Sequence, residues 1–212
     1  MRKSVRAWRR AGKIAAFMNE YIESPEEYLN RHYPDKRFIK VEGRSIGDEN
    51  IPPYIIRENN GCVINAAACI LAYALKAQNR RLDTLKPCRS IAERLFRKAR
   101  RNDYYVPLGR TSHFLNSCAK FLGISGSAKS SIFARRNAVF EINSGRPVFL
   151  NIAYSRQYKD HTVIAYGWER YRIKGRGSRS ILFFKIRDGY SKDTRYLVWK
   201  NVFGVFSTSF VL

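Results

Sequence analysis

Histidine is the scarcest of the residues that could build a metal site. The chain has only three, His32, His113 and His161, and none lies near a cysteine at the spacing of zinc ligands. No CxxC pair occurs either. The sequence therefore argues against a structural metal.

Cysteine is also sparse, with four residues at Cys62, Cys69, Cys88 and Cys118, an even count that could form two disulfides in a secreted protein. Cys62 and Cys69 fall in one predicted helix, where a rise of about 1.5 Å per residue separates them by about 10 Å, beyond the roughly 7 Å limit for a disulfide. Behind its positively charged start, the N-terminus lacks the apolar stretch of about 7 to 15 residues that a signal peptide has. We expect free thiols and a cytoplasmic location, and leave export by another route open.

Acidic residues number 17 against 40 lysines and arginines, so the formal net charge is +23. This excess predicts attraction to an acidic partner, which could be nucleic acid, an anionic membrane surface or an acidic protein. The basic residues are dispersed along the chain, so a role in solubility alone stays open. No apolar run approaches the roughly 20 residues of a transmembrane helix, and we expect no such segment.

The 212 residues are 45% hydrophobic and 14% aromatic, enough to build one sizeable core. We expect a single domain over 1–212, with an N-terminal helical extension over 1–40 and a core over 55–212. An apolar stripe predicts an amphipathic helix over 5–22, which either docks on the domain or lies on lipid or nucleic acid. Ser24 and Pro25 indicate the start of a second, short helix that ends before Pro34.

Residues 40–60 are rich in glycine, proline and asparagine and predict a loop. The alanine-rich run that begins at Cys62 predicts a central, strongly apolar helix. Further helices are indicated over about 89–101, over 113–122 after a Thr111–Ser112 cap, and over 135–144.

After Gly145 the chain becomes rich in β-branched and aromatic residues. Turn formers divide it into five predicted strands of an antiparallel sheet, over 147–154, 161–171, 180–190, 195–200 and 204–212. A helical first half followed by a strand-rich second half predicts an α+β fold. The segment 174–179, KGRGSR, is interpreted as a basic hairpin loop.

Cys62 follows a loop rich in glycine and asparagine and begins the apolar helix. Free amides and the positive end of the helix dipole at this position stabilise a thiolate, so we expect its pKa to be lowered. The same amides could bind the oxyanion that forms when the thiolate attacks a carbonyl carbon. The alternative for an isolated cysteine is a small core residue.

His161 opens one predicted strand, and Asp188 closes the next. If the two strands form a hairpin, Asp188 lies beside His161, where a carboxylate could orient the imidazole. We expect His161 at the edge of a cleft, with little burial. The alternatives are a capping histidine and a turn-forming aspartate before Gly189.

The run Asn59–Cys62 leading into AAACILAYA, followed by GRPVFLNIAY, DHTVIAYGW and FFKIRDGY, resembles the bacterial papain-like cysteine peptidases, and within them the branch of the double-glycine leader peptidases. The resemblance covers about 55–200. It implies a papain-like fold with Cys62 as nucleophile, His161 as base and Asp188 as the orienting residue. The glutamine that completes the family's oxyanion hole is missing, with Ile56 at its spacing, and Asn60 is our candidate substitute.

These features predict a thiol hydrolase that cleaves a peptide, isopeptide or related amide bond in a protein or peptide substrate through an acyl-enzyme. Such an enzyme needs no metal or organic cofactor. An acyl transferase would use the same three residues. The alternative from another class is a basic protein that binds nucleic acid or an anionic surface through the loop 174–179 and one helix, with Arg94, Arg97, Lys98, Arg100 and Arg101.

Overall fold

The computed structural model describes residues 21–53, 61–79, 85–99, 106–155, 158–175, 180–202 and 205–212. Nearly all of the helix predicted over 5–22 lies outside the described residues, and so does Asn60. Ile22, at the end of that stripe, is buried and forms an isolated β-bridge with Tyr196.

A seven-stranded antiparallel sheet is the centre of the described structure. Its main path runs in the order β2-β7-β3-β4-β5-β6, and β1 pairs with β4 outside this path. The strands are β1 Phe38–Ser45, β2 Ser127–Ser131, β3 Val148–Ser155, β4 Lys159–Ile173, β5 Ser180–Arg187, β6 Arg195–Val198 and β7 Val205–Val211.

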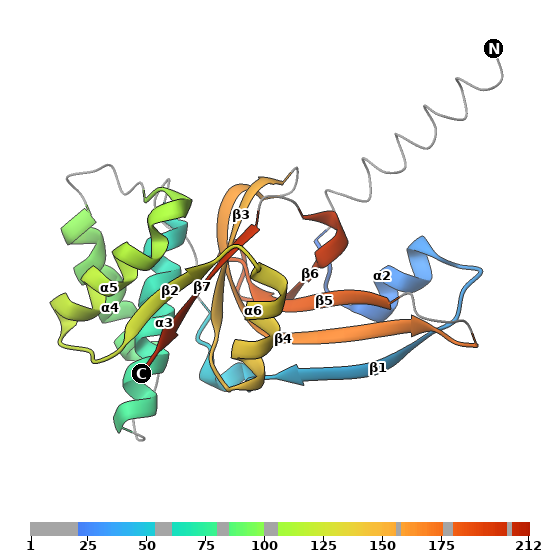
Figure 1. The fold of residues 1–212 in the computed structure, drawn as a ribbon, viewed down its shortest axis with the longest axis horizontal. Helices are drawn as coiled ribbons and strands as arrows, with labels where there is room; N and C mark the ends of the chain where they lie inside the picture. Colours follow the sequence, from blue (N-terminus) through green and yellow to red (C-terminus); the bar gives the residue numbers. More distant parts are fainter. Residues whose placement is uncertain are drawn as a thin grey trace, which may run out of the picture.

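Helices cover both faces of the sheet (Figure 1). Alternation along β4 turns Ile164 and Tyr166 toward the helix α3 and its neighbours, and turns Val163 and Ala165 toward the helix α6. The helices are α2 Pro25–His32, α3 Cys62–Asn79, α4 Leu85–Ala99, α5 Thr111–Leu122 and α6 Ala134–Asn143, with short 3-10 turns at Asp48–Asn50, Leu108–Arg110 and Trp199–Asn201.

The helix α3 lies between the sheet and the helices α4 and α5, so nearly every side of it is buried. Its run of alanines, including the fully buried Ala66, Ala67 and Ala68, lets the neighbouring backbones come close. This environment explains why the segment is apolar all round and lacks the polar stripe of a surface helix.

The helix α2 begins as its sequence predicts. The side chain of Ser24 accepts a hydrogen bond from the Glu27 amide at 3.3 Å, and Pro25 occupies the first helical position. Tyr28 and Leu29 are buried against Tyr171, Phe183 and Val198, so α2 covers the far end of the sheet face on which α3 lies.

Two local predictions are wrong. Part of the segment predicted as a loop over 40–60 forms β1, which pairs with β4 from Phe38 to Ser45. The side chain of Thr111 does not cap α5: it is buried and contacts the hydroxyl of Thr208 at 2.8 Å. The helix therefore begins at Thr111 without a side-chain cap.

The predicted α+β class is confirmed, since five helices pack on an antiparallel sheet among the described residues. In the same part of the chain, no helix combines the length and the apolar character that crossing a membrane requires.

Candidate active site

Cys62 is the first residue of α3, directly after the loop that enters the helix. Asn65 closes the first turn, because its backbone N–H and its side-chain amide both donate to the Gly61 carbonyl, at 3.0 and 2.9 Å. The side chain of Cys62 is partly exposed, whereas Cys69, Cys88 and Cys118 are buried. All four cysteines are free thiols.

The pKa of the Cys62 thiol is raised above its ordinary value, because burial penalises the thiolate. The backbone N–H groups of Thr162, Val63 and Cys62 itself lower the pKa, but they do not outweigh burial. The predicted lowering is therefore wrong for the resting protein. Desolvation by the surrounding core is larger than the stabilisation from the start of the helix.

His161 is the third residue of β4 and is only 3% exposed, so the predicted position at an open cleft edge is wrong. Its ring is stacked with Tyr190 at 4.6 Å between ring centroids and with Tyr158 at 5.6 Å. Burial lowers the pKa of His161, while the carbonyl and the charge of Asp188 act in the opposite direction. This shift favours the neutral imidazole at pH 7.

β4 and β5 form the hairpin that would place Asp188 beside His161. The group that holds the ring is the main-chain carbonyl of Asp188, whose oxygen lies 2.7 Å from His161 Nε2. The Asp188 carboxylate instead accepts from the backbone N–H groups of Tyr190 and Ser191, at 2.9 and 3.4 Å through Oδ1. Its other oxygen, Oδ2, is buried without a hydrogen-bond partner in the described structure.

This use of the carboxylate shapes the turn after β5. Gly189 lies inside the turn with φ of 79°, a conformation that favours glycine. The side chain of Asp188 thus fixes the loop, and the loop in turn fixes the carbonyl that the imidazole binds.

Cys62 and His161 do not contact each other in the described residues. Thr162 lies against the cysteine sulfur, and alternation along β4 turns its neighbour His161 to the other face, together with Val163. The two ring nitrogens of His161 face Asp188 and Tyr190. The structure therefore brings His161 together with Asp188, and places Cys62 beside the strand residue that follows His161.

Tyr190 lies near both Cys62 and His161. Its hydroxyl lies 3.5 Å from His161 Nδ1, and the side chain is 50% exposed. Burial raises the pKa of Tyr190, and the charges of Tyr21 and of a Cys62 thiolate raise it further. Its only signal in the sequence is its place in the same DGY run as Asp188.

A buried polar network extends from Thr162 away from the cysteine. The Thr162 hydroxyl donates to Asn151 Oδ1 at 2.9 Å, and the amide of Asn151 donates to the hydroxyls of Thr111 and Thr208 at 3.1 and 3.2 Å. The sequence gives only a weak signal for it, polar residues within otherwise apolar strands. Because every one of these groups is buried and bonded, the network fixes the position of Thr162.

The basic surface predicted on one helix lies on α4. Arg94 and Arg97 are exposed, and the guanidinium of Arg94 lies 5.1 Å from the ring centroid of Phe121. Arg100, Arg101 and 176–179 lie outside the described residues, as does the side chain of Lys98. Throughout the described ranges, no group of three histidine, cysteine or acidic side chains is placed to hold a metal ion.

The fold and the site together define an α+β protein with a free cysteine at the start of its central helix and a buried histidine on the adjacent strand. No family model matches the chain, and no curated protein sequence matches it.

Proposed function

We propose that this protein is a thiol hydrolase with a papain-like fold, which cleaves amide bonds with Cys62 as nucleophile, His161 as base and Asp188 as the residue that holds the base. One observation carries the proposal. The sulfur of Cys62 lies at the backbone N–H of Thr162, the residue that follows His161, and the His161 ring is anchored on Asp188.

The anchoring contact selects the tautomer. A carbonyl oxygen only accepts, so His161 Nε2 carries the proton and donates to Asp188. Nδ1 is then unprotonated and able to accept a proton. The lowered pKa of His161 favours the neutral form at pH 7, as a general base requires.

Tyr190 covers Nδ1 in the described structure. At 3.5 Å its hydroxyl contact is long for an O–H hydrogen bond, and the half-exposed ring can turn toward solvent. In our proposal the substrate displaces this ring, and the start of α3 and the start of β4 then close on the scissile bond.

The proposed reaction takes place only after this closure, because Cys62 and His161 do not contact each other in the described structure. Nδ1 takes the thiol proton of Cys62, and the sulfur forms a bond to the substrate carbonyl carbon. As the carbon–nitrogen bond breaks, Nδ1 returns the proton to the leaving amine. Water then attacks the thioester, and the acid and the thiol are released. The backbone N–H groups of Cys62 and Val63 are the described candidates for binding the oxyanion.

The experiment is acylation by p-nitrophenyl acetate, with the site of acylation identified by mass spectrometry. We expect a burst of p-nitrophenol and one acetyl group on Cys62. His161→Gln should slow the burst by about 10² to 10⁴-fold, the range for loss of a general base. His113→Gln is the matched control, since His113 is exposed on α5, and it should leave the burst unchanged.

Acylation elsewhere than at Cys62, or equal rates in the two histidine variants, would contradict the proposal. Adding glycine methyl ester then separates the hydrolase from a transferase. A hydrolase releases acetate at a rate that the amine does not change, whereas a transferase forms the acetylated amine.

A further inference from the structure

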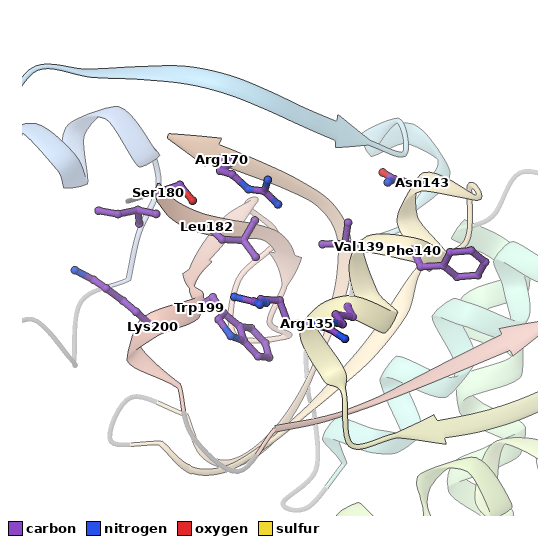
Figure 2. A pocket seen from close by; sticks show the side chains of 11 residues that line it. Arg135, Val139, Phe140, Asn143, Arg170, Ser180, Leu182, Trp199 and Lys200 are labelled. Atoms are coloured by element: carbon purple, nitrogen blue, oxygen red, sulfur yellow. The ribbon is translucent and has the colours of Figure 1, made fainter. Parts of the chain in front are cut away.

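A cavity of about 700 Å³ lies on the α6 face of the sheet, between α6, the hairpin of β4 and β5, and the 3-10 turn Trp199–Asn201. Figure 2 shows Arg170 and Trp199 on either side of Leu182, with α6 beside them carrying Arg135 and Val139. We call it the basic pocket. Arg170 lies nine positions after His161 along β4, about 30 Å of extended chain, so the pocket is a separate site.

The lining of the basic pocket is unbalanced in charge. It contains the four cations Arg135, Arg136, Arg170 and Lys200, and no acidic residue. Arg170 forms an ion pair with Glu42. Lys200 donates to the Tyr33 hydroxyl and lies 4.8 Å from the centroid of that ring.

Arg135 and Arg136 differ from the other two cations. Both side chains are exposed, and neither forms an ion pair or a hydrogen bond with another described residue. Like charges held close together repel each other and oppose folding. A bound anion would relieve this repulsion, and arginine binds phosphate oxygens well through its planar fork of N–H groups.

The rest of the lining is mostly apolar, with Asn143 and Ser180 as its polar members. Leu182 and Val139 form part of it, and the half-buried indole of Trp199 is held edge-on by Phe184, with ring centroids 5.6 Å apart. A rigid indole beside unpaired arginines suits a ligand that combines a flat ring with a phosphate.

We propose that the basic pocket binds a nucleoside phosphate, with the phosphate oxygens on Arg135 and Arg136 and the base on Trp199. The source is either a free nucleotide or a nucleotide within single-stranded RNA. An acidic peptide fits less well, because its carboxylates bring no flat ring to lie on the indole of Trp199.

The experiment measures fluorescence anisotropy of a short labelled oligoadenylate on the full chain, with AMP, tripolyphosphate and oligoglutamate as competitors. The test variant is Arg135→Gln with Arg136→Gln. The matched control is Arg94→Gln with Arg97→Gln, which removes the same two charges from the exposed surface of α4. Thermal melting establishes that both variants are folded.

We expect the pocket variant to bind about tenfold or more weakly, and the α4 variant to bind like the parent. The slope of log K against log salt should fall by about 1.4 in the pocket variant, the value for two lost phosphate contacts on a single strand. Trp199→Leu should weaken oligoadenylate and leave tripolyphosphate unchanged. Competition by AMP identifies a free nucleotide as the source, and its absence identifies single-stranded RNA.

Three outcomes would overturn the proposal. The first is the absence of binding by oligoadenylate and AMP alike. The second is equal or greater weakening in the α4 variant, which would show attraction to the overall charge or binding on the basic helix α4. The third is competition by tripolyphosphate or oligoglutamate at the concentrations at which the nucleotide competes, which would show that the base contributes nothing.

Discussion

The site around Cys62 and the basic pocket use charge in opposite ways. His161 is buried and Cys62 is partly exposed, and desolvation at both positions favours the neutral thiol and the neutral imidazole. In the basic pocket the arginines of α6 are exposed and stay charged. The comparison teaches that reactivity at the first site depends on small movements in a low-dielectric environment, whereas binding at the second depends on charge that salt can screen.

The largest difference between the two sites is expected when the nucleophile is replaced. Cys62→Ser should reduce acylation by p-nitrophenyl acetate by about 10⁴-fold or more, because the other residues cannot act without the sulfur. Binding of oligoadenylate should be unchanged, because the pocket is a separate site. Cys88→Ala is the control, and acylation at the parent rate in Cys62→Ser would remove Cys62 from the mechanism.

The next largest effect concerns the turn that holds the base. Asp188→Ala should slow acylation by about 10²-fold, because two backbone N–H groups lose their acceptor and the carbonyl under His161 shifts. Asp188→Asn keeps the Oδ1 acceptor and should lose less than tenfold. Equal activity in Asp188→Ala and the parent, measured in one burst assay, would show that the turn does not position the ring.

Salt should affect the two regions differently, by a smaller factor than these substitutions. Raising KCl from about 50 to about 200 mM should weaken oligoadenylate binding about sevenfold for two phosphate contacts. Acylation of a neutral ester should change less than twofold, since the buried groups are poorly screened. An acylation burst that depends on salt, together with binding that does not, would contradict this difference between the two sites.

Substitutions of Tyr190 should change the rate of Cys62 alkylation by a few-fold. Removing its ring in Tyr190→Ala uncovers Nδ1, so alkylation of Cys62 by iodoacetamide should become several-fold faster. Tyr190→Phe keeps the stacked ring and should react like the parent, because the hydroxyl contact is long. A slower reaction in Tyr190→Phe would instead make the hydroxyl part of the proton path.

The smallest expected effect is on stability against pH. The pKa of His161 is lowered in the folded protein, so the unfolded chain takes up a proton first as the pH falls below about 6.5. The free energy of unfolding should therefore decrease between about pH 6.5 and the folded pKa. Urea unfolding of His161→Gln should show a flatter profile in this range, and parallel profiles would show that folding does not lower the pKa of His161.

Periodic segments of the sequence predicted their own structure. The alanine-rich run forms α3 from Cys62 onward, and the five strand segments after Gly145 form β3 to β7, because their side chains are buried in a regular pattern. β1 was not predicted, because it lacks such a buried pattern. Seven of its eight residues are exposed, so it has no buried face to leave an alternating pattern.

The chemistry of the candidate site was harder to predict from sequence. A helix start predicts a lowered thiol pKa, but the burial of Cys62 depends on how α3 packs, which local sequence does not encode. The contact that holds His161 comes from a main-chain carbonyl, and a carbonyl has no residue type by which a sequence could reveal it. Arg135 and Arg136 approach the far end of the β4–β5 hairpin only in the folded chain.

The most direct test of the central claim, that Cys62 reacts with His161 as its base, is the pH profile of the acylation burst. In the parent the rate should fall as the pH drops through the lowered pKa of His161, because protonation of Nδ1 removes the base. His161→Gln should be slower throughout and should lose this fall, leaving only the rise with thiolate at high pH. The same profile in both proteins, at the same rates, would contradict the account.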